Sequence, residues 1–154
     1  MALLEELQES WSKDSIFNEA DLGNESLVIP SLHQKYHIYY NKYKLILEDE
    51  KLKLKRIYRE QWLWYSGKKT DDKGQVFDLK VLKGDLNTFL DSDEEIQKQS
   101  LRVTYFETCI NYIENILKMI NNRGFQVKNA IDAKRYEFPV WWLLLPKRMK
   151  CISV

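Results

Sequence analysis

Apolar residues in the first half of the chain recur at alternating steps of four and three, which is the spacing of a heptad seam. The seam predicts one helix that begins near Pro30 and Ser31, because Pro suits a first helical turn and Ser a cap, and that ends at Gly67. Glu50 and Gln61 fill the places where the pattern lacks an apolar residue. The apolar members of the seam are Tyr36, Tyr40, Tyr43, Leu47, Leu54, Ile57 and Trp64.

A second apolar rib lies roughly opposite this seam on the same predicted helix, at about 100° per residue. It consists of Ile38, Leu45, Leu52 and Leu63. A helix with two apolar ribs is normally packed between neighbours. In a chain of 154 residues, we expect some of those neighbours to belong to other subunits.

A second long helix is predicted to begin at the capping-box sequence Ser92-Asp93-Glu94-Glu95, which places acidic residues in the first turn. Gln99 is the one polar residue on its seam. Arg123 and Gly124 predict its end, as a cationic last turn and a C′ glycine. The seam is expected in the protein core or in a subunit contact, and its apolar members are Ile96, Val103, Phe106, Ile110, Ile113, Leu117 and Ile120.

The remaining segments complete a mainly α fold. Residues 1–30 predict an acidic amphipathic helix and a linker, and a third, shorter helix is predicted over 126–136. Three glycines and five aspartates in 67–91 indicate a small irregular or β insert. The main domain, 31–137, is therefore predicted as two long helices in an antiparallel α-hairpin with heptad seams, flanked by short N-terminal and C-terminal helices.

The tail 138–154 is hydrophobic and then basic, and Pro139 and Pro146 disfavour a continuous helix within it. It is interpreted as an arm that docks on a neighbouring subunit or, alternatively, as a membrane-surface anchor. No apolar run reaches the length of a membrane span, and the acidic start does not fit a signal peptide, so no membrane partner is expected. Cys109 and Cys151 follow no spacing pattern, which favours a reducing compartment without a disulfide framework.

The segment from Lys51 to Lys69 carries the clearest candidate chemistry. Cations interleave with aromatic rings there, and single-stranded nucleic acid needs both, because phosphates provide most of the affinity and unstacked bases rest on aromatic faces. The alternative is a solvated face with a packed seam behind it. Trp62 falls on the basic stripe and is expected to be partly exposed, whereas Trp64 falls on the seam and is expected to be packed. The candidate nucleic-acid-binding residues are Lys51, Lys55, Arg56, Arg59, Trp62, Lys68 and Lys69.

Charge alternates along the chain although the overall balance is only +1. The blocks 1–30, 31–69, 70–100 and 101–154 carry net charges of −6, +6, −4 and +5. This alternation suggests a local positive field for a polyanion. It could equally serve head-to-tail contacts between subunits, in which an acidic block meets a basic one.

Catalytic interpretations find little support in the sequence. His33 and His37 have a spacing that can bind zinc, but no third ligand lies nearby, so no metal site is predicted. The acidic residues around Asp71 and Asp93 are explained more simply as a solvated loop and a helix N-terminus. No phosphate-binding loop, nucleophile elbow or dinucleotide fingerprint occurs. We therefore expect neither enzymatic activity nor a cofactor.

Two turns resemble those of the UvsY recombination mediators of T4-like bacteriophages. The first is Trp64-Tyr65-Ser66-Gly67 after a basic helix, and the second is Asn122-Arg123-Gly124-Phe125-Gln126-Val127-Lys128. An acidic linker separates them, and Asp132, Arg135 and Glu137 follow. The likeness extends from the acidic amphipathic start to about Glu137.

This resemblance implies a non-catalytic protein that forms rings, as a hexamer or heptamer, in the cytoplasm of an infected bacterium. Such proteins bind single-stranded DNA non-specifically and help to load a phage RecA-like recombinase onto strands covered by the phage single-strand-binding protein. The domain 31–137 would then carry both DNA binding and oligomerisation. A coiled-coil assembly or scaffold protein without a DNA role is the alternative.

The resemblance also implies roles for particular residues. Of the family's two basic contacts, the first falls on Arg59 and the second on Gln61, so half of that pair is missing. The family's self-assembly region falls on 125–137. The candidate oligomerisation residues are Val103, Phe106, Ile110, Ile113, Leu117, Ile120, Phe125, Val127 and Ile131.

Overall fold

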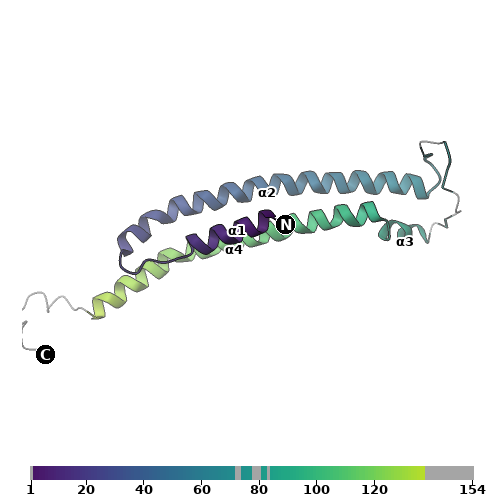
Figure 1. Ribbon diagram of the computed structural model, residues 1–154. Helices are drawn as coiled ribbons and strands as arrows, with labels where there is room; N and C mark the ends of the chain where they lie inside the picture. The colour runs from purple at the N-terminus through teal and green to yellow at the C-terminus, as the bar shows by residue number, and fades with distance from the viewer. Residues whose placement is uncertain (1, 72–73, 78–80, 83, 138–154) are drawn as a thin grey trace, which may run out of the picture. The chain divides into compact units, whose positions relative to one another are not determined.

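The computed structural model describes residues 2–71, 74–77, 81–82 and 84–137, and these are mainly helical. The helices are α1 (Ala2–Asp14), α2 (Leu22–Tyr65), α3 (Leu86–Asp91) and α4 (Glu94–Glu137) (Figure 1). The described part of the predicted insert contains one isolated β-bridge, between Thr70 and Val76, and no strand. The predicted tail lies outside the described residues. The described chain forms two compact units, 38–114 and 2–37 with 115–137.

In the unit 38–114, the segments of α2 and α4 pack antiparallel along the predicted seams. The Tyr43 ring packs against the Phe106 ring, with centroids 6.4 Å apart. Farther along α2, Tyr65 donates a hydrogen bond to Asp93, which precedes Phe106 in the chain, so the two segments run in opposite directions. The heptad prediction is confirmed for most of its members in this unit, which are buried, whereas Tyr40, Leu54, Ile57 and Trp64 are half-buried. The buried seam residues of this unit are Tyr43, Leu47, Ile96, Val103, Phe106, Ile110 and Ile113.

The two polar exceptions on these seams contact each other. Gln99 Nε2 donates to the Glu50 carboxylate at 2.6 Å and to the Glu50 carbonyl at 3.0 Å. Glu50 is only 3% exposed and also pairs with Lys53 and Arg102. Hydrogen bonds from Lys53 and Gln99 outweigh the effect of burial and lower the pKa of Glu50 below its ordinary 4.5. A polar pair therefore replaces one apolar layer without leaving a buried group unsatisfied.

The start of α4 depends on Asp93, whereas the capping-box prediction assigned the capping role to Ser92. Asp93 Oδ1 accepts the backbone N–H groups of Glu95 and Ile96, each at 3.0 Å. Its Oδ2 accepts a hydrogen bond from the Tyr65 hydroxyl at 2.9 Å. Burial and this acidic partner raise the pKa of Tyr65 to about 12. The carboxylate thus caps α4 and fastens the last turn of α2 beside it.

The predicted start of α2 at Pro30 is wrong, because the helix begins eight residues earlier, at Leu22. Asp21 Oδ1 accepts the backbone N–H of Asn24 at 3.0 Å, as an N-cap residue does. Pro30 lies inside the helix, and Ser31 donates its hydroxyl proton to the Val28 carbonyl instead of capping. The segment between α1 and α2 is correspondingly short, at 15–21.

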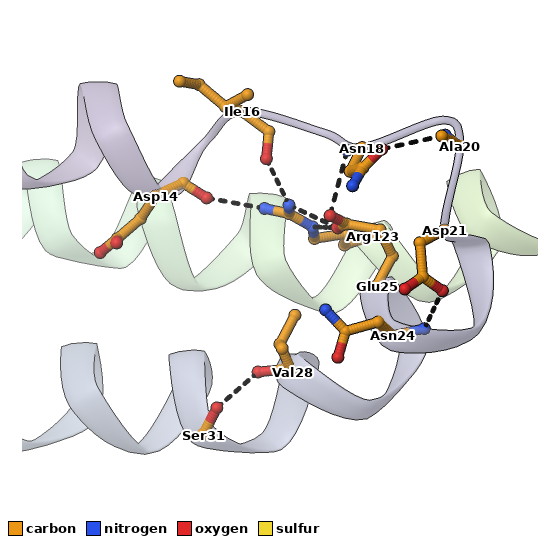
Figure 2. A network of polar contacts seen from close by, with 10 residues as sticks. All are labelled: Asp14, Ile16, Asn18, Ala20, Asp21, Asn24, Glu25, Val28, Ser31 and Arg123. Atoms are coloured by element: carbon orange, nitrogen blue, oxygen red, sulfur yellow. Dashed lines mark hydrogen bonds and ion pairs between the residues drawn. The ribbon is translucent and has the colours of Figure 1, made fainter.

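The predicted helix end at Arg123 and Gly124 is also wrong, since α4 continues to Glu137 and includes the predicted separate helix 126–136. Gly124 does not take the positive φ of a C′ glycine. Arg123 is buried, and its guanidinium donates to Glu25 at 2.7 Å, to the Asp14 carbonyl at 2.9 Å and to the Ile16 carbonyl at 2.8 Å (Figure 2). The arginine is therefore an internal crosslink and does not mark a helix end.

Glu25 completes this network from the first turn of α2. Glu25 is 6% exposed, and its carboxylate also accepts a hydrogen bond from the Asn18 backbone N–H at 3.0 Å (Figure 2). Burial alone would raise the pKa of Glu25, but the hydrogen bonds from Arg123 and Asn18 and the arginine's charge hold it below 4.5. The network joins α4 to the segment 15–21 and to the first turn of α2. In α1, Leu7 is buried, and the Trp11 ring packs edge-on against Tyr36 of α2.

Candidate nucleic-acid interface

The last turns of α2 expose three cations that form no close ion pair with any described residue. Lys55, Arg56 and Arg59 are exposed, and within the described part of the chain none has a carboxylate oxygen within 4.0 Å of its charged nitrogens. Residues three and four apart share a helix face, so Arg59 lies beside both Lys55 and Arg56. Clustered cations without a close carboxylate create a local positive potential, which attracts the phosphates of a nucleic-acid backbone.

Two other predicted site residues are neutralised by neighbours. Lys51 pairs with Glu107 of α4 at 3.1 Å, and Lys69 forms an ion pair with Glu60. The hydrogen bond from Lys69 lowers the pKa of Glu60. Exposed ion pairs of this kind are weak, so each lysine could exchange its partner, but only at the loss of an existing contact. The predicted set therefore divides into unpaired and paired cations.

The predicted pair Lys68 and Trp62 is brought together at the end of α2. The Lys68 ammonium lies over the Trp62 ring, 4.3 Å from its centroid. Lys68 is exposed and Trp62 is half-buried. The pair continues the row of unpaired cations beyond Arg59, since Trp62 follows Arg59 by three positions on the same helix.

Trp64 has a different environment, although it is also half-buried. Its ring packs edge-on against Phe77, with centroids 5.7 Å apart, and Phe77 in turn contacts Tyr65 and Phe89. The two indoles thus differ in their contacts more than in exposed area. Trp64 belongs to a packed aromatic cluster, whereas the Trp62 ring is covered by the Lys68 ammonium.

A groove of about 550 Å³ lies beside the unpaired cations. Gln61, at the position of the family's second basic contact, lines it and donates from Nε2 to Glu95 at 3.0 Å. Arg56 and Lys69 bring positive charge to the groove, but Glu60, Asp71 and Glu95 bring more negative charge. A polyanion is therefore better accommodated along Lys55 and Arg59 than inside the groove.

Most predicted oligomerisation residues are buried within the single chain. Leu117 is half-buried, whereas Phe125 is 70% exposed and Ile131 is at 36%. The buried ones are Val103, Phe106, Ile110, Ile113, Ile120 and Val127. Cys109 is buried, as its place in an apolar helical run predicts, whereas sequence reasoning missed the buried Ile116, which lies three residues from the seam member Ile113. The second rib is exposed in one chain at Ile38, Leu45 and Leu52.

Other candidate chemistry is sparse in the described chain. The rings of His33 and His37 stack on each other with centroids 5.8 Å apart. Among the residues that the structure describes, no group of three or more His, Cys, Asp or Glu side chains could hold a metal ion. Of the described helices, none is long and apolar enough to cross a membrane.

Long paired helices, with an exposed row of cations at the end of one of them, place the chain in a class of mainly helical proteins with a surface suited to a polyanion. Comparison with known proteins makes the assignment specific. The family model described as "Recombination, repair and ssDNA binding protein UvsY" matches residues 10–138. The chain belongs to this family, as the two sequence motifs indicated.

Individual relatives agree with this assignment. The recombination protein uvsY of Enterobacteria phage T4 is 26% identical over 137 residues, which cover 87% of this chain and 96% of that protein. Two crystal structures of the bacteriophage T4 recombination mediator protein UvsY share the fold. One has a TM-score of 0.80 at 22% identity, covering 86% of this chain and 98% of that chain. The other has a TM-score of 0.79 at 23% identity, covering 87% and 96%.

Proposed function

We propose that this chain is a recombination mediator that binds single-stranded DNA non-specifically and promotes the loading of a phage RecA-like recombinase. The recombinase would be loaded onto strands covered by single-strand-binding protein. The process would serve phage homologous recombination, repair and recombination-dependent replication in the cytoplasm of the infected host. The role is non-catalytic. Family membership supports the general activity, and the unpaired cations Lys55, Arg56 and Arg59 are the observation that carries DNA binding in this chain.

The strand is proposed to follow these cations and to continue to Lys68 and Trp62. Within the described chain, no carboxylate oxygen lies within 4.0 Å of a cation on this path, so binding a phosphate there breaks no existing close ion pair. Released counterions then drive association, with a salt slope of about −0.7 for each phosphate contact on a single strand. Lys51 and Lys69 contribute less, because each must first leave a carboxylate.

Assembly into a ring is proposed to multiply this weak site. Tethered sites raise the effective concentration of cations along one strand, which gives avidity without any new contact within the subunit. The exposed apolar side chains at Phe125, at Ile131 and on the rib at Ile38, Leu45 and Leu52 are the candidates for subunit contacts. A wrapped strand would hold the competing binding protein less firmly and would present an extended backbone to the recombinase.

The decisive experiment measures recombinase assembly on DNA strands already covered by single-strand-binding protein. Adding the chain should shorten the lag before the recombinase's DNA-dependent ATP hydrolysis begins. The double charge reversal of Lys55→Glu with Arg59→Glu should abolish this effect. Lys98→Glu with Lys118→Glu changes the same amount of charge at exposed positions of α4 and should preserve it.

The alternative function, an assembly protein without a DNA role, predicts a different result. The wild-type chain would then leave the lag unchanged and would not bind labelled single-stranded DNA at any salt concentration. Binding without a shorter lag would retain the DNA site and refute the mediator role.

A further inference from the structure

The turn that ends α2 fixes the backbone of Lys68. Gly67 takes a φ of +68°, which residues with a Cβ rarely adopt. The Gly67 N–H donates to the Trp64 carbonyl at 3.0 Å, and the Lys68 N–H donates to the Leu63 carbonyl at 2.9 Å. These paired hydrogen bonds form a Schellman motif, in which the residue after the glycine packs back on the last helical turn. Here that residue is Lys68, and the ring beneath it is that of Trp62.

The contact between them is a cation–π pair in an exposed setting. The ammonium is 4.3 Å from the indole centroid, and no carboxylate of the described chain lies within ion-pair distance of it. The adjacent Lys69 differs, since it is paired with Glu60. The two consecutive lysines therefore have different partners, since Lys69 forms an ion pair with Glu60 and Lys68 covers one face of the Trp62 ring.

We infer that Lys68 is a displaceable cover on the face of Trp62 that stacks a DNA base. In the free protein the ammonium occupies this face. When a strand binds, a base takes the ring and the ammonium moves to a neighbouring phosphate. This inference rests on the proposed DNA-binding function and specifies how one residue pair serves it.

The exchange is favourable for two physical reasons. Stacking a base on an indole is stronger than an exposed cation–π contact, so the base wins the ring. The displaced ammonium is not left without a partner, because the same strand supplies phosphates beside the base. Lys68 consequently adds affinity through the phosphate and subtracts affinity by competing with the base.

These opposing effects predict a salt-dependent outcome for Lys68→Ala. Loss of one phosphate contact should reduce the magnitude of the salt slope by about 0.7 per chain, so that the affinity of the variant relative to wild type rises about fivefold over a tenfold increase in salt. The variant should bind more weakly than wild type at low salt and more tightly at high salt, where the uncovered ring dominates.

The experiment titrates labelled single-stranded DNA into wild type, Lys68→Ala and Lys55→Ala across a salt series. Lys55→Ala is the matched control, because it also removes one exposed, unpaired cation but uncovers no ring. It should show the same change in slope without exceeding wild-type affinity at high salt. Each of the three proteins is also made with Trp62→Phe, and subtracting the fluorescence of that version isolates the signal of Trp62. DNA should quench this signal more completely in Lys68→Ala than in wild type or Lys55→Ala.

Three outcomes separate the claims. Crossing binding curves with stronger quenching of Trp62 in Lys68→Ala support the inference. If Lys68→Ala behaves as Lys55→Ala does in both readouts, Lys68 is an ordinary phosphate contact and the inference is overturned while DNA binding stands. If the wild-type chain does not bind the strand, the proposed function fails and the inference falls with it.

Discussion

Replacing Arg123 by Met is expected to destabilise the unit that contains α1 and the beginning of α2. The guanidinium donates four hydrogen bonds, two of them to Glu25 and one each to the carbonyls of Asp14 and Ile16. It also lies over the Phe17 ring, 5.7 Å from the centroid. Met can fill part of the volume, but it can make none of these polar contacts.

The size of the effect follows from what the substitution leaves behind. The Glu25 carboxylate would remain buried without its counter-charge, holding only the Asn18 N–H among its present hydrogen-bond donors. Removing one partner of a buried ion pair typically costs about 3–5 kcal/mol. The network joins residues 98 to 109 positions apart, so its loss should also loosen the segment 15–21.

Urea unfolding followed by circular dichroism measures the free energy, and limited proteolysis reports on the segment 15–21. Arg135→Met is the matched control, because Arg135 lies on the same helix but its pair with Asp132 is exposed and 3.7 Å long. It should lose much less stability. Arg123→Met combined with Glu25→Leu should recover part of the loss by removing the unpaired carboxylate. An Arg123→Met variant within about 0.5 kcal/mol of wild type would refute this account of the network.

Other predictions follow from single contacts. Ile113→Asp should abolish stable folding, because the side chain is fully buried and an unpaired carboxylate would replace it; a soluble, equally stable variant would show that the seam is misplaced. Glu25 has a pKa below 4.5 in the folded state, so its contribution to the free energy of unfolding should be constant near neutral pH and lost as the pH falls below about 4.5; Glu25→Gln should flatten that acid limb. Arg59→Ala should weaken binding of single-stranded DNA more than Lys51→Ala, because Lys51 is already paired with Glu107; equal losses in an anisotropy titration would remove this distinction.

The seams could be predicted from the sequence because heptad spacing is a local property. Tyr43, Phe106 and Ile113 lie where the period places them, and even the polar exceptions Glu50 and Gln99 are consistent with it, since they satisfy each other. The heptad spacing did not predict that these two polar residues hydrogen-bond to each other. They are 49 residues apart in the chain, and a local sequence pattern carries no information on contacts at that separation.

The helix ends were mispredicted for a related reason. Pro30 is a local start signal and Gly124 a local stop signal, and tertiary contacts overrode both. The buried pair of Glu25 and Arg123 ties the true first turn of α2 to α4, so α2 begins before Pro30 and α4 continues past Gly124. A pair 98 positions apart is visible only once the chain is folded.

For the candidate DNA site, the sequence predicts a region but not which of its cations are paired. The charge and aromatic content of the sequence predict the segment 51–69 as the candidate site. Composition does not show which of its cations form ion pairs with acidic residues. Lys51 meets an acid on another helix, and Lys69 meets one nine residues earlier. The position of Lys68 over Trp62 was encoded locally, by the glycine that turns the chain back, but it depends on a hydrogen-bond pattern and not on composition.

The salt dependence of single-stranded DNA binding by the wild-type chain tests the central claim most directly. Fluorescence anisotropy of a labelled strand, run across a salt series beside sedimentation to count the bound subunits, gives the slope per chain. On this surface, the cations that form no close ion pair with a described residue are Lys55, Arg56, Arg59 and Lys68. They predict a slope of about −2.8 per chain, falling to about half when Lys55 and Arg59 are both replaced by Ala. Absence of binding, or an affinity that salt does not change, would contradict the assignment of this surface to DNA.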